Sequence, residues 1–271
     1  MGMLTIKRIP VFLLLLLSAS FAVALIEPQA REVASGDTID LGTIGPGQTV
    51  NILFNRKVTN GGIHGIGGLY DQAVVYDLPR GWNGVDSKLY QDPLQVTISA
   101  APDAPEGEYS AKLKVIDENG GEGLGDVVLN IKVNVTYDVM DFDVSPSYMS
   151  VGPGQPARFA ITITNKGSTS DVFQVSSMGA KRWEFKKPVF VPAHGMKTIY
   201  YDIVPMEEET YKASVDIVSL ASNNIADQKN VTLFVRSDLL GDYKATNNGV
   251  VLFPIYESIT YAIAGLISNL Y

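Results

Sequence analysis

Short runs in which hydrophobic and polar residues alternate recur along most of the chain. In Leu94–Ala100, every second residue is aliphatic or alanine and the residues between them are Gln, Thr and Ser. A period of two places alternate side chains on opposite faces of a strand, so each run predicts a half-buried β-strand. The predicted strands are Thr49–Phe54, Gln72–Leu78, Leu94–Ala100, Tyr109–Ile116 and Val127–Val135, and then Ala157–Asn165, Asp171–Ser177, Lys197–Val204, Tyr211–Ser219 and Lys229–Val235.

The pattern is duplicated. Ile44–Gln48 reads IGPGQ and Val151–Gln155 reads VGPGQ, and each precedes a predicted strand. Short solenoid repeats recur every ~20 to 50 residues, so a period near ~100 residues indicates two copies of a whole domain. No stretch between residues 27 and 236 has a convincing helical period. The sequence therefore predicts an all-β protein with two tandem immunoglobulin-like β-sandwiches, and the GPGQ turn is expected to mark architecture only.

The start of the chain belongs to neither copy. Lys7 and Arg8 precede the apolar run Val11–Leu17, and Ala22–Ala24 provides the small residues of a cleavage site. This order predicts a secretory signal peptide that is cleaved after Ala24. The alternative is a retained transmembrane helix, but the apolar run is shorter than the ~20 residues that a span requires.

The β pattern stops after Arg236, and an apolar segment follows. Val250–Tyr271 contains one charged residue, Glu257. A helix from Pro254 would be about 27 Å long, slightly short of the hydrocarbon core unless Val250–Phe253 extend it. Its weakly polar face would pack on another helix. That helix-packing face comprises Glu257, Tyr261, Gly265 and Ser268.

Two interpretations of this segment stay open. It either crosses a membrane, or it docks on a partner or lies in the membrane interface as an amphipathic helix. No Lys or Arg follows the apolar stripe, which weakens a simple single-span anchor, but membrane association is favoured. The expected organisation is a signal peptide at 1–24, sandwiches at 25–137 and 138–236, a polar connector at 237–249 and a hydrophobic C-terminal helix at 250–271.

Charge and cysteine content narrow the class of protein. Lys7 and Arg8 are the only charged residues in the predicted leader, so its removal changes the net charge from −8 to −10. A nucleic-acid partner is therefore not expected. The chain has no cysteine, so an exported form would be stabilised by packing without disulfides.

A family resemblance adds to this interpretation. GPGQ is followed by a strand ending in Thr164–Gly167, a Trp-containing loop, and an acidic turn before a strand that starts with Tyr. This order resembles the tandem CARDB-type immunoglobulin-like domains that are common in archaeal cell-surface proteins, including membrane-anchored and S-layer-associated ones. The resemblance covers roughly residues 37 to 236, and the first copy departs from it by the insertion Asn60–Gly68. It implies the fold and a surface location, and it carries no catalytic residues.

Catalytic chemistry is not indicated. His64 and His194 are the only histidines and fall in different predicted domains, and no G-x-S-x-G or H-E-x-x-H motif occurs. We therefore expect a protein that is not an enzyme and needs no cofactor. Gly61–Gly68 leads into a strand, whereas a nucleotide-binding loop leads into a helix. It is expected to be an exposed loop, with contact to a partner subunit as the alternative.

Three further features have a structural and a functional interpretation. The hairpin loop with Asp117, Asn119, Glu122 and Asp126 is rich in oxygen ligands for Ca²⁺, although its spacing misses the twelve-residue calcium loop and Asn119 starts a strong turn signal. Asn134 and Asn230 begin N-x-T sequons, which makes them glycosylation candidates in an exported chain. Trp82 and Trp183 each follow the second predicted strand of their copy. They are expected to anchor the cores, with an aromatic ligand platform as the alternative.

These observations predict an exported, membrane-associated cell-envelope scaffold or adhesion protein, with two sandwiches end to end as a fairly stiff rod. It would be a surface-layer stalk or an extracytoplasmic subunit of a membrane complex, held to an envelope protein or to copies of itself. One alternative is a carbohydrate- or peptide-binding module of an exported enzyme, for which the adjacent Tyr200 and Tyr201 would present one exposed ring. Another alternative is a secreted filament subunit.

Overall fold

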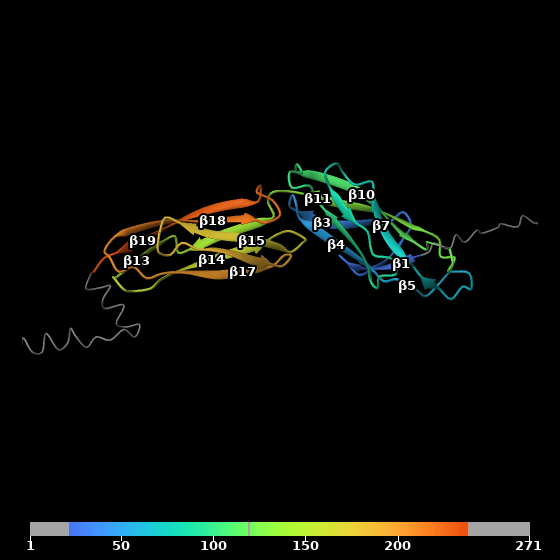
Figure 1. Ribbon diagram of the computed structural model, residues 1–271, viewed down its shortest axis with the longest axis horizontal. Coiled ribbons are helices and arrows are strands. Elements are labelled where there is room, and N and C mark those ends of the chain that lie inside the picture. Colours follow the sequence, from blue (N-terminus) through green and yellow to red (C-terminus); the bar gives the residue numbers. More distant parts are fainter. Residues whose placement is uncertain (1–21, 119, 238–271) are drawn as a thin grey trace, which may run out of the picture.

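The computed structural model describes residues 22–118 and 120–237, which consist of β-strands, turns and loops (Figure 1). No helix occurs within these ranges, and accordingly no membrane-spanning helix is found there. The expectation of an all-β protein is confirmed for this part of the chain. The predicted C-terminal helix, with its packing face of Glu257, Tyr261, Gly265 and Ser268, lies outside the described residues.

The first domain packs a five-stranded sheet, in the order β2-β1-β4-β9-β8, against a four-stranded sheet, in the order β3-β11-β10-β7. A separate two-stranded ladder, β5-β6, closes the base of the loop that the sequence marked as an insertion. The strands are β1 Ala22–Glu27, β2 Arg31–Ala34, β3 Thr38–Ile44, β4 Thr49–Phe54, β5 Lys57–Val58, β6 Gly68–Leu69, β7 Gln72–Tyr76, β8 Asn83–Val85, β9 Leu94–Ser99, β10 Gly107–Ile116 and β11 Val127–Val135.

The second domain repeats this plan with a three-stranded sheet, β12-β14-β17, and a five-stranded sheet, β13-β19-β18-β15-β16. In each domain the strand before the GPGQ turn pairs in parallel with the last strand, and the other ladders between named strands are antiparallel. Both units are immunoglobulin-like β-sandwiches. The strands are β12 Met140–Ser145, β13 Tyr148–Val151, β14 Ala157–Asn165, β15 Asp171–Met178, β16 Lys186–Val191, β17 Met196–Ile203, β18 Thr210–Ser219 and β19 Ala226–Val235.

Each domain has its own hydrophobic core. Alternation along the strands supplies it: in β9 every second side chain is buried, and β14 follows the same rule. Phe54 and Tyr70 are among the largest buried side chains of the first core, and Phe159 and Phe173 of the second. The two clusters share no residue, so each sandwich buries apolar surface on its own.

All ten strands predicted from alternation are present, with ends that differ by at most a few residues. Several further strands were not predicted, including β12, whose residues also alternate. The edge strand β16 contains Lys186, Lys187 and Pro188, and an edge position tolerates a proline because its N–H is not needed in the ladder.

Strand β1 includes the residues of the predicted cleavage site. Val23 and Leu25 are 1% and 2% exposed, and β1 pairs with β2 and β4. Ala22–Ala24 form the first half of this strand, so cleavage after Ala24 would remove core and ladder contacts. Export and processing stay predictions.

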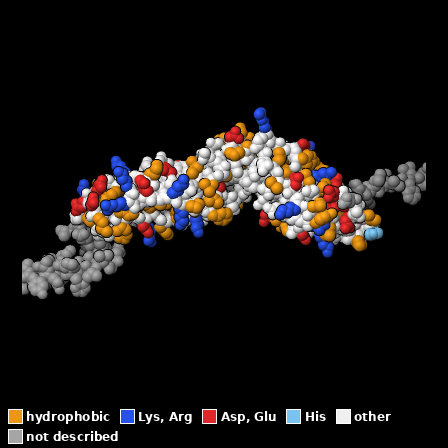
Figure 2. Space-filling view, in the orientation of Figure 1, with side chains coloured by type: hydrophobic (Ala, Val, Ile, Leu, Met, Phe, Trp, Pro, Cys, Tyr) orange, Lys and Arg blue, Asp and Glu red, His pale blue; other side chains and the backbone are white. Residues whose placement is uncertain are grey.

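The two sandwiches lie end to end in an elongated molecule (Figure 1). The β5-β6 ladder lies at one end, and β13 and β19 finish at the other. Acidic and basic side chains are interspersed on the visible face of both domains (Figure 2).

Candidate functional site

The two domains meet at the first GPGQ turn, Gly45–Gln48, between β3 and β4. The Gln48 side chain is buried, and its oxygen accepts the N–H of Gly45 at 2.7 Å. Its side-chain nitrogen donates to Oδ2 of Asp171, in the second domain, at 2.8 Å. One amide therefore holds its own turn and ties that turn to the other sandwich.

Asp171 is 7% exposed, so its carboxylate needs donors to replace lost water. Besides Gln48, the hydroxyl of Ser219 donates to Oδ2 at 2.7 Å and the N–H of Val172 donates to Oδ1 at 2.7 Å. These three hydrogen bonds offset the desolvation of the carboxylate and make the joint specific for this pair of loops.

Backbone contacts surround this buried pair. The N–H of Ser168 donates to the carbonyl of Thr43 at 2.7 Å, and the Ser168 hydroxyl accepts the N–H of Thr43 at 3.0 Å. The Thr169 hydroxyl donates to the carbonyl of Thr49 at 2.6 Å. On another loop, the hydroxyl of Ser222 donates to the carbonyl of Pro102 at 2.8 Å. Several separate loops thus fix the angle between the domains.

The glycines of the first turn permit the close approach. A side chain on Gly45 would collide with Ile225, and one on Gly47 would collide with the carbonyl of Ala221. Gly47 also has a φ of 70°, which favours glycine. The expectation that this motif is only a turn before a core strand was incomplete, because in the first copy it also forms the interdomain joint.

The glycine-rich loop and the acidic hairpin come together at the free end of the first domain. The N–H of Ile63, in the glycine-rich loop, donates to the carbonyl of Glu122 in the hairpin at 2.9 Å. Ile63 and Ile66 are 65% and 77% exposed beside them, and His64 is also exposed. The loops therefore form one surface, which we call the tip: residues 61–68 with the described part of 117–126.

The calcium candidates serve the hairpin itself. Oδ2 of Asp117 accepts the N–H groups of Glu122 and Leu124, both at 3.2 Å, and Asp126 pairs with Lys114 at 2.6 Å. Among the described residues, no three His, Cys, Asp or Glu side chains are grouped as a metal site requires. Asn119 lies outside them, and calcium binding stays a prediction.

Tyr70 lies under the tip with its side chain fully buried. Burial raises the pKa of its hydroxyl to about 12, with smaller contributions from the negative charges of Asp117 and Asp126. The hydroxyl has no hydrogen-bond partner among the described residues. The Tyr70 hydroxyl therefore stays protonated and neutral at physiological pH.

The sequons lie on the last strand of their domains, but not at equivalent positions. Strands β11 and β19 end at Val135 and Val235, so Asn134 is one residue from its strand end and Asn230 is five. Asn134 is half-buried, whereas Asn230 is exposed. Asn230 is therefore the better placed acceptor, and glycosylation of either site stays a prediction.

Each tryptophan packs against a tyrosine that the sequence repeats. Trp82 and Tyr109 have ring centroids 5.1 Å apart, and Trp183 meets Tyr211 edge-on at 5.6 Å. Both tryptophans are half-buried against the edge of their core, and neither is the fully enclosed anchor that we expected. The repeated strand-initiating tyrosines were the sequence signal for this pairing.

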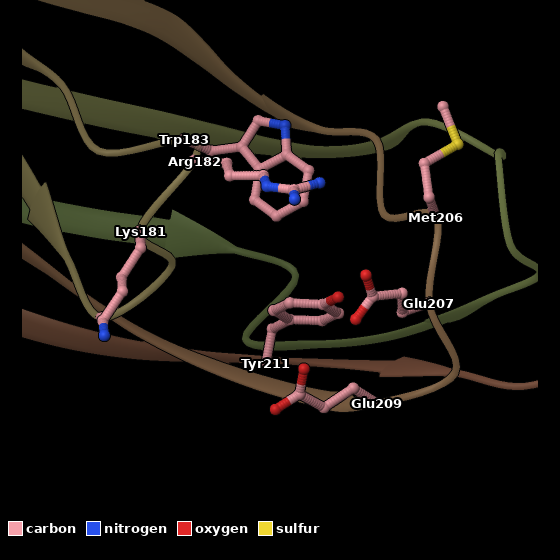
Figure 3. Close-up of a pocket in the computed structure, with 8 residues that line it drawn as sticks. Lys181, Arg182, Trp183, Met206, Glu207, Glu209 and Tyr211 are labelled. Carbon is pink, nitrogen blue, oxygen red and sulfur yellow. The ribbon is translucent and has the colours of Figure 1, made fainter.

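In the second domain the Trp183–Tyr211 pair lines a cavity of about 320 Å³ (Figure 3). Lys181, Arg182, Glu207 and Glu209 surround it, so its rim carries both signs of charge. Figure 3 shows the Tyr211 hydroxyl directed toward Glu207.

Partial burial raises the pKa of Tyr211, and Glu209 and Glu207 raise it further. Among the described residues, no serine, cysteine or histidine lines this cavity.

The exposed ring expected for a carbohydrate module is present, and a cation lies over it. Tyr200 is 62% exposed and Tyr201 is 3% exposed, as their adjacent positions on β17 predicted. The guanidinium of Arg158 lies 5.2 Å from the centroid of the Tyr200 ring and pairs with Asp202 at 2.7 Å.

Neither a protein-family model nor a curated protein matches the sequence. Solved structures that resemble it include the CARDB domain of the PF1109 protein of Pyrococcus furiosus in complex with di-metal ions, at 17% identity and a TM-score of 0.26. That match covers 37% of this chain and 93% of the other. A chimeric titin Z1Z2 matches at 14% identity and a TM-score of 0.37, over 81% of this chain and all of the other.

The complex of zinc 2-glycoprotein with prolactin inducible protein from human seminal plasma also matches. It has 14% identity and a TM-score of 0.31, over 36% of this chain and 95% of the other. All three scores lie below 0.5, so these likenesses carry no argument about function. The immunoglobulin-like assignment rests on the strand order described above.

Proposed function

We propose that the protein is an exported, membrane-associated scaffold of the cell envelope that holds a protein partner at a set distance. The buried joint carries this proposal. Domains joined only by a linker move relative to one another, whereas here Gln48 and Asp171 form a buried hydrogen bond across the boundary. A spacer needs such stiffness, and a pair of independent binding modules does not.

The tip is the proposed contact surface for the partner. Its exposed Ile63 and Ile66 are unusual for solvated loops, and apolar side chains at a loop end suit a protein contact. The tip lies at the opposite end of the rod from β19, after which the chain continues toward its apolar C-terminal segment (Figure 1). In this proposal the apolar segment holds one end at the membrane and the tip projects outward.

The location rests on sequence features. The leader pattern supports export, and the apolar composition of Val250–Tyr271 supports membrane attachment. An archaeal surface protein, either a stalk of the surface layer or an extracytoplasmic subunit of a membrane complex, fits this arrangement. The mechanism is positional and uses no catalytic residue or cofactor.

Fractionation of native membranes tests the attachment. We expect the protein to stay with the membrane in alkaline carbonate and to be released by detergent. Release by carbonate alone would contradict attachment through the apolar segment.

Crosslinking in intact cells tests the contact surface. The Ile66→Asp variant should lose the crosslink to the partner, because a charge at the tip must be desolvated on binding. Met196→Asp is the matched control, because Met196 is 66% exposed in the second domain, away from the tip. An equal loss in both variants, or no loss in either, would show that the tip is not the contact.

A further inference from the structure

The second GPGQ turn, Gly152–Gln155, repeats the first in conformation. The Gln155 side-chain oxygen accepts the N–H of Gly152 at 3.1 Å, as Gln48 does for Gly45. Gly154 has a φ of 79°, close to the value at Gly47. The second turn is thus built like the turn that receives a neighbouring domain in the joint.

The chain also leaves the two sandwiches by the same route. After β11, the N–H of Thr136 donates to the carbonyl of Ile44 at 3.0 Å. After β19, the N–H of Arg236 donates to the carbonyl of Val151 at 3.1 Å. Each acceptor is the residue immediately before the glycine that opens the GPGQ turn, so the outgoing chain passes beside the turn in both copies.

The next residue repeats a second contact. The N–H of Tyr137 donates to Oε1 of Glu106 at 2.8 Å, and the N–H of Ser237 donates to Oε1 of Glu208 at 3.1 Å. These contacts hold the outgoing chain in place by charge-assisted hydrogen bonds, and hydrogen bonds from the linker lower the pKa of both carboxyls. The exit geometry is therefore equivalent through Ser237.

In the first copy, the residues that follow cover the turn. Asp138 pairs with Lys166, and Val139 is fully buried. A methyl group built on Gly45 would lie 3.0 Å from Cγ2 of Val139. The sequence continues in the same way after both strands, with Asp-Val-Met at 138–140 and Asp-Leu-Leu at 238–240.

We propose that the Gly152–Gln155 turn is the docking site for the chain's own continuation, with Leu239 covering Gly152 as Val139 covers Gly45. Pro46 is buried in the joint, whereas Pro153 is exposed, so the second turn retains apolar surface for an incoming side chain. The inference holds whether residues 250–271 enter a membrane or a partner, and so it does not rest on the proposed function.

The sequence contains no cysteine, so a single introduced cysteine is the only thiol that a maleimide reagent can alkylate. Leu239→Cys, Val139→Cys and Leu220→Cys are introduced singly into the full chain, and their alkylation rates by N-ethylmaleimide are compared. Leu220 is 61% exposed and provides the open reference, whereas Val139 provides the covered one. We expect Leu239→Cys to react at least about tenfold more slowly than Leu220→Cys, because a docked thiol reacts only through local opening.

A second substitution shows whether the turn provides the protection. Gly152→Asp or Gln155→Ala, added to Leu239→Cys, should return alkylation to the rate of the open reference. Gly45→Asp in the Val139→Cys chain is the matched control in the known joint. Fast reaction of Leu239→Cys alone, or slow reaction that survives both turn substitutions, would overturn the proposal. Gln155→Ala decides the matter if Gly152→Asp does not fold.

Discussion

The side-chain amide of Gln48 connects the two sandwiches, because its oxygen and its nitrogen bind different domains. Its oxygen is used within the turn, and its nitrogen reaches the buried carboxylate of Asp171. Removing the amide would leave the buried carboxylate with one hydrogen-bond donor fewer. The resulting loss of stability is larger than the loss expected when an exposed hydrogen bond is removed, because water cannot replace the missing donor.

Gln48→Ala should therefore lower the free energy of unfolding by about 1–3 kcal/mol, measured by urea denaturation. The matched control is Gln228→Ala, whose exposed amide donates to Ser214 on the neighbouring strand. That change should stay within about 0.5 kcal/mol of the unmodified protein, as most surface substitutions do. Equal effects of the two substitutions would contradict a special role for the joint.

Glu106 gives the linker a dependence on pH. The hydroxyl of Thr136, followed by the N–H of Tyr137, lowers the carboxyl pKa below its ordinary value of 4.5. A carboxyl with a lowered folded pKa stabilises the protein above its unfolded pKa, and this contribution is lost as pH falls through the folded pKa. The free energy of unfolding, measured by urea denaturation, should therefore fall less between about pH 5 and pH 3 in the Glu106→Gln variant than in the unmodified protein. Identical pH profiles would show that these hydrogen bonds do not couple to folding.

Some residue-scale features were predictable and others were not. The opposite exposure of Tyr200 and Tyr201 follows from the period of a strand. The contact of Gln48 with Asp171 does not, because sequence patterns specify which side chains are buried within a domain. They do not specify which loops of two domains face each other.

At the scale of elements, alternation located the central strands because one face of each is buried and the other is not. Edge strands such as β16 escape this signal, since they are short and their residues need not alternate. Strand β1 escaped for another reason. Its apolar residues continue the composition of the predicted leader, and the small residues at Ala22 and Ala24 suit a strand as well as a cleavage site.

Cleavage after Ala24 would shorten strand β1, and the effect on stability can be measured. A chain that starts at Leu25 lacks Val23, which is 1% exposed and pairs with Val33. It should be less stable by about 1.5–3 kcal/mol than a chain that starts at Phe21, because a buried valine is lost from the core. Urea denaturation of the two chains measures the difference. Equal stability would mean that the first half of β1 is dispensable.

At the scale of the whole molecule, the elongated shape depends on the closeness of the joint. Gly47 and Gly154 occupy equivalent turns with similar positive φ values, so alanine strains both to a similar degree. Only at Gly47 would the added methyl group meet the backbone of the other domain, at Ala221. At Gly154 it meets no atom of the described residues within 4 Å.

Small-angle X-ray scattering of Gly47→Ala and Gly154→Ala should therefore give different results. We expect Gly47→Ala to broaden the distribution of interatomic distances as the domains reorient. Gly154→Ala should retain the distribution of the unmodified protein. Superimposable curves for all three proteins would show that the joint tolerates the methyl group and does not set the shape.

The tip is a second case in which the sequence did not show that two distant loops lie side by side. The glycine-rich loop and the acidic hairpin were each identified in the sequence, but they lie far apart along the chain and gave no sign that they adjoin. The fold brings them together because β7 and β10 are neighbours in one sheet, so the loop before β7 and the hairpin after β10 share one end of the sandwich.

The parallel pairing of β3 with β11, and of β13 with β19, has a mechanical consequence. When such a rod is pulled at its ends, tension enters the first sandwich through β1 and the second through β12, and it leaves each sandwich near the end of the later of the two parallel strands. The ladder between them is then loaded in shear, so its hydrogen bonds share the force and do not peel apart one at a time. Each sandwich thus resists stretching along the axis in which the two domains are stacked.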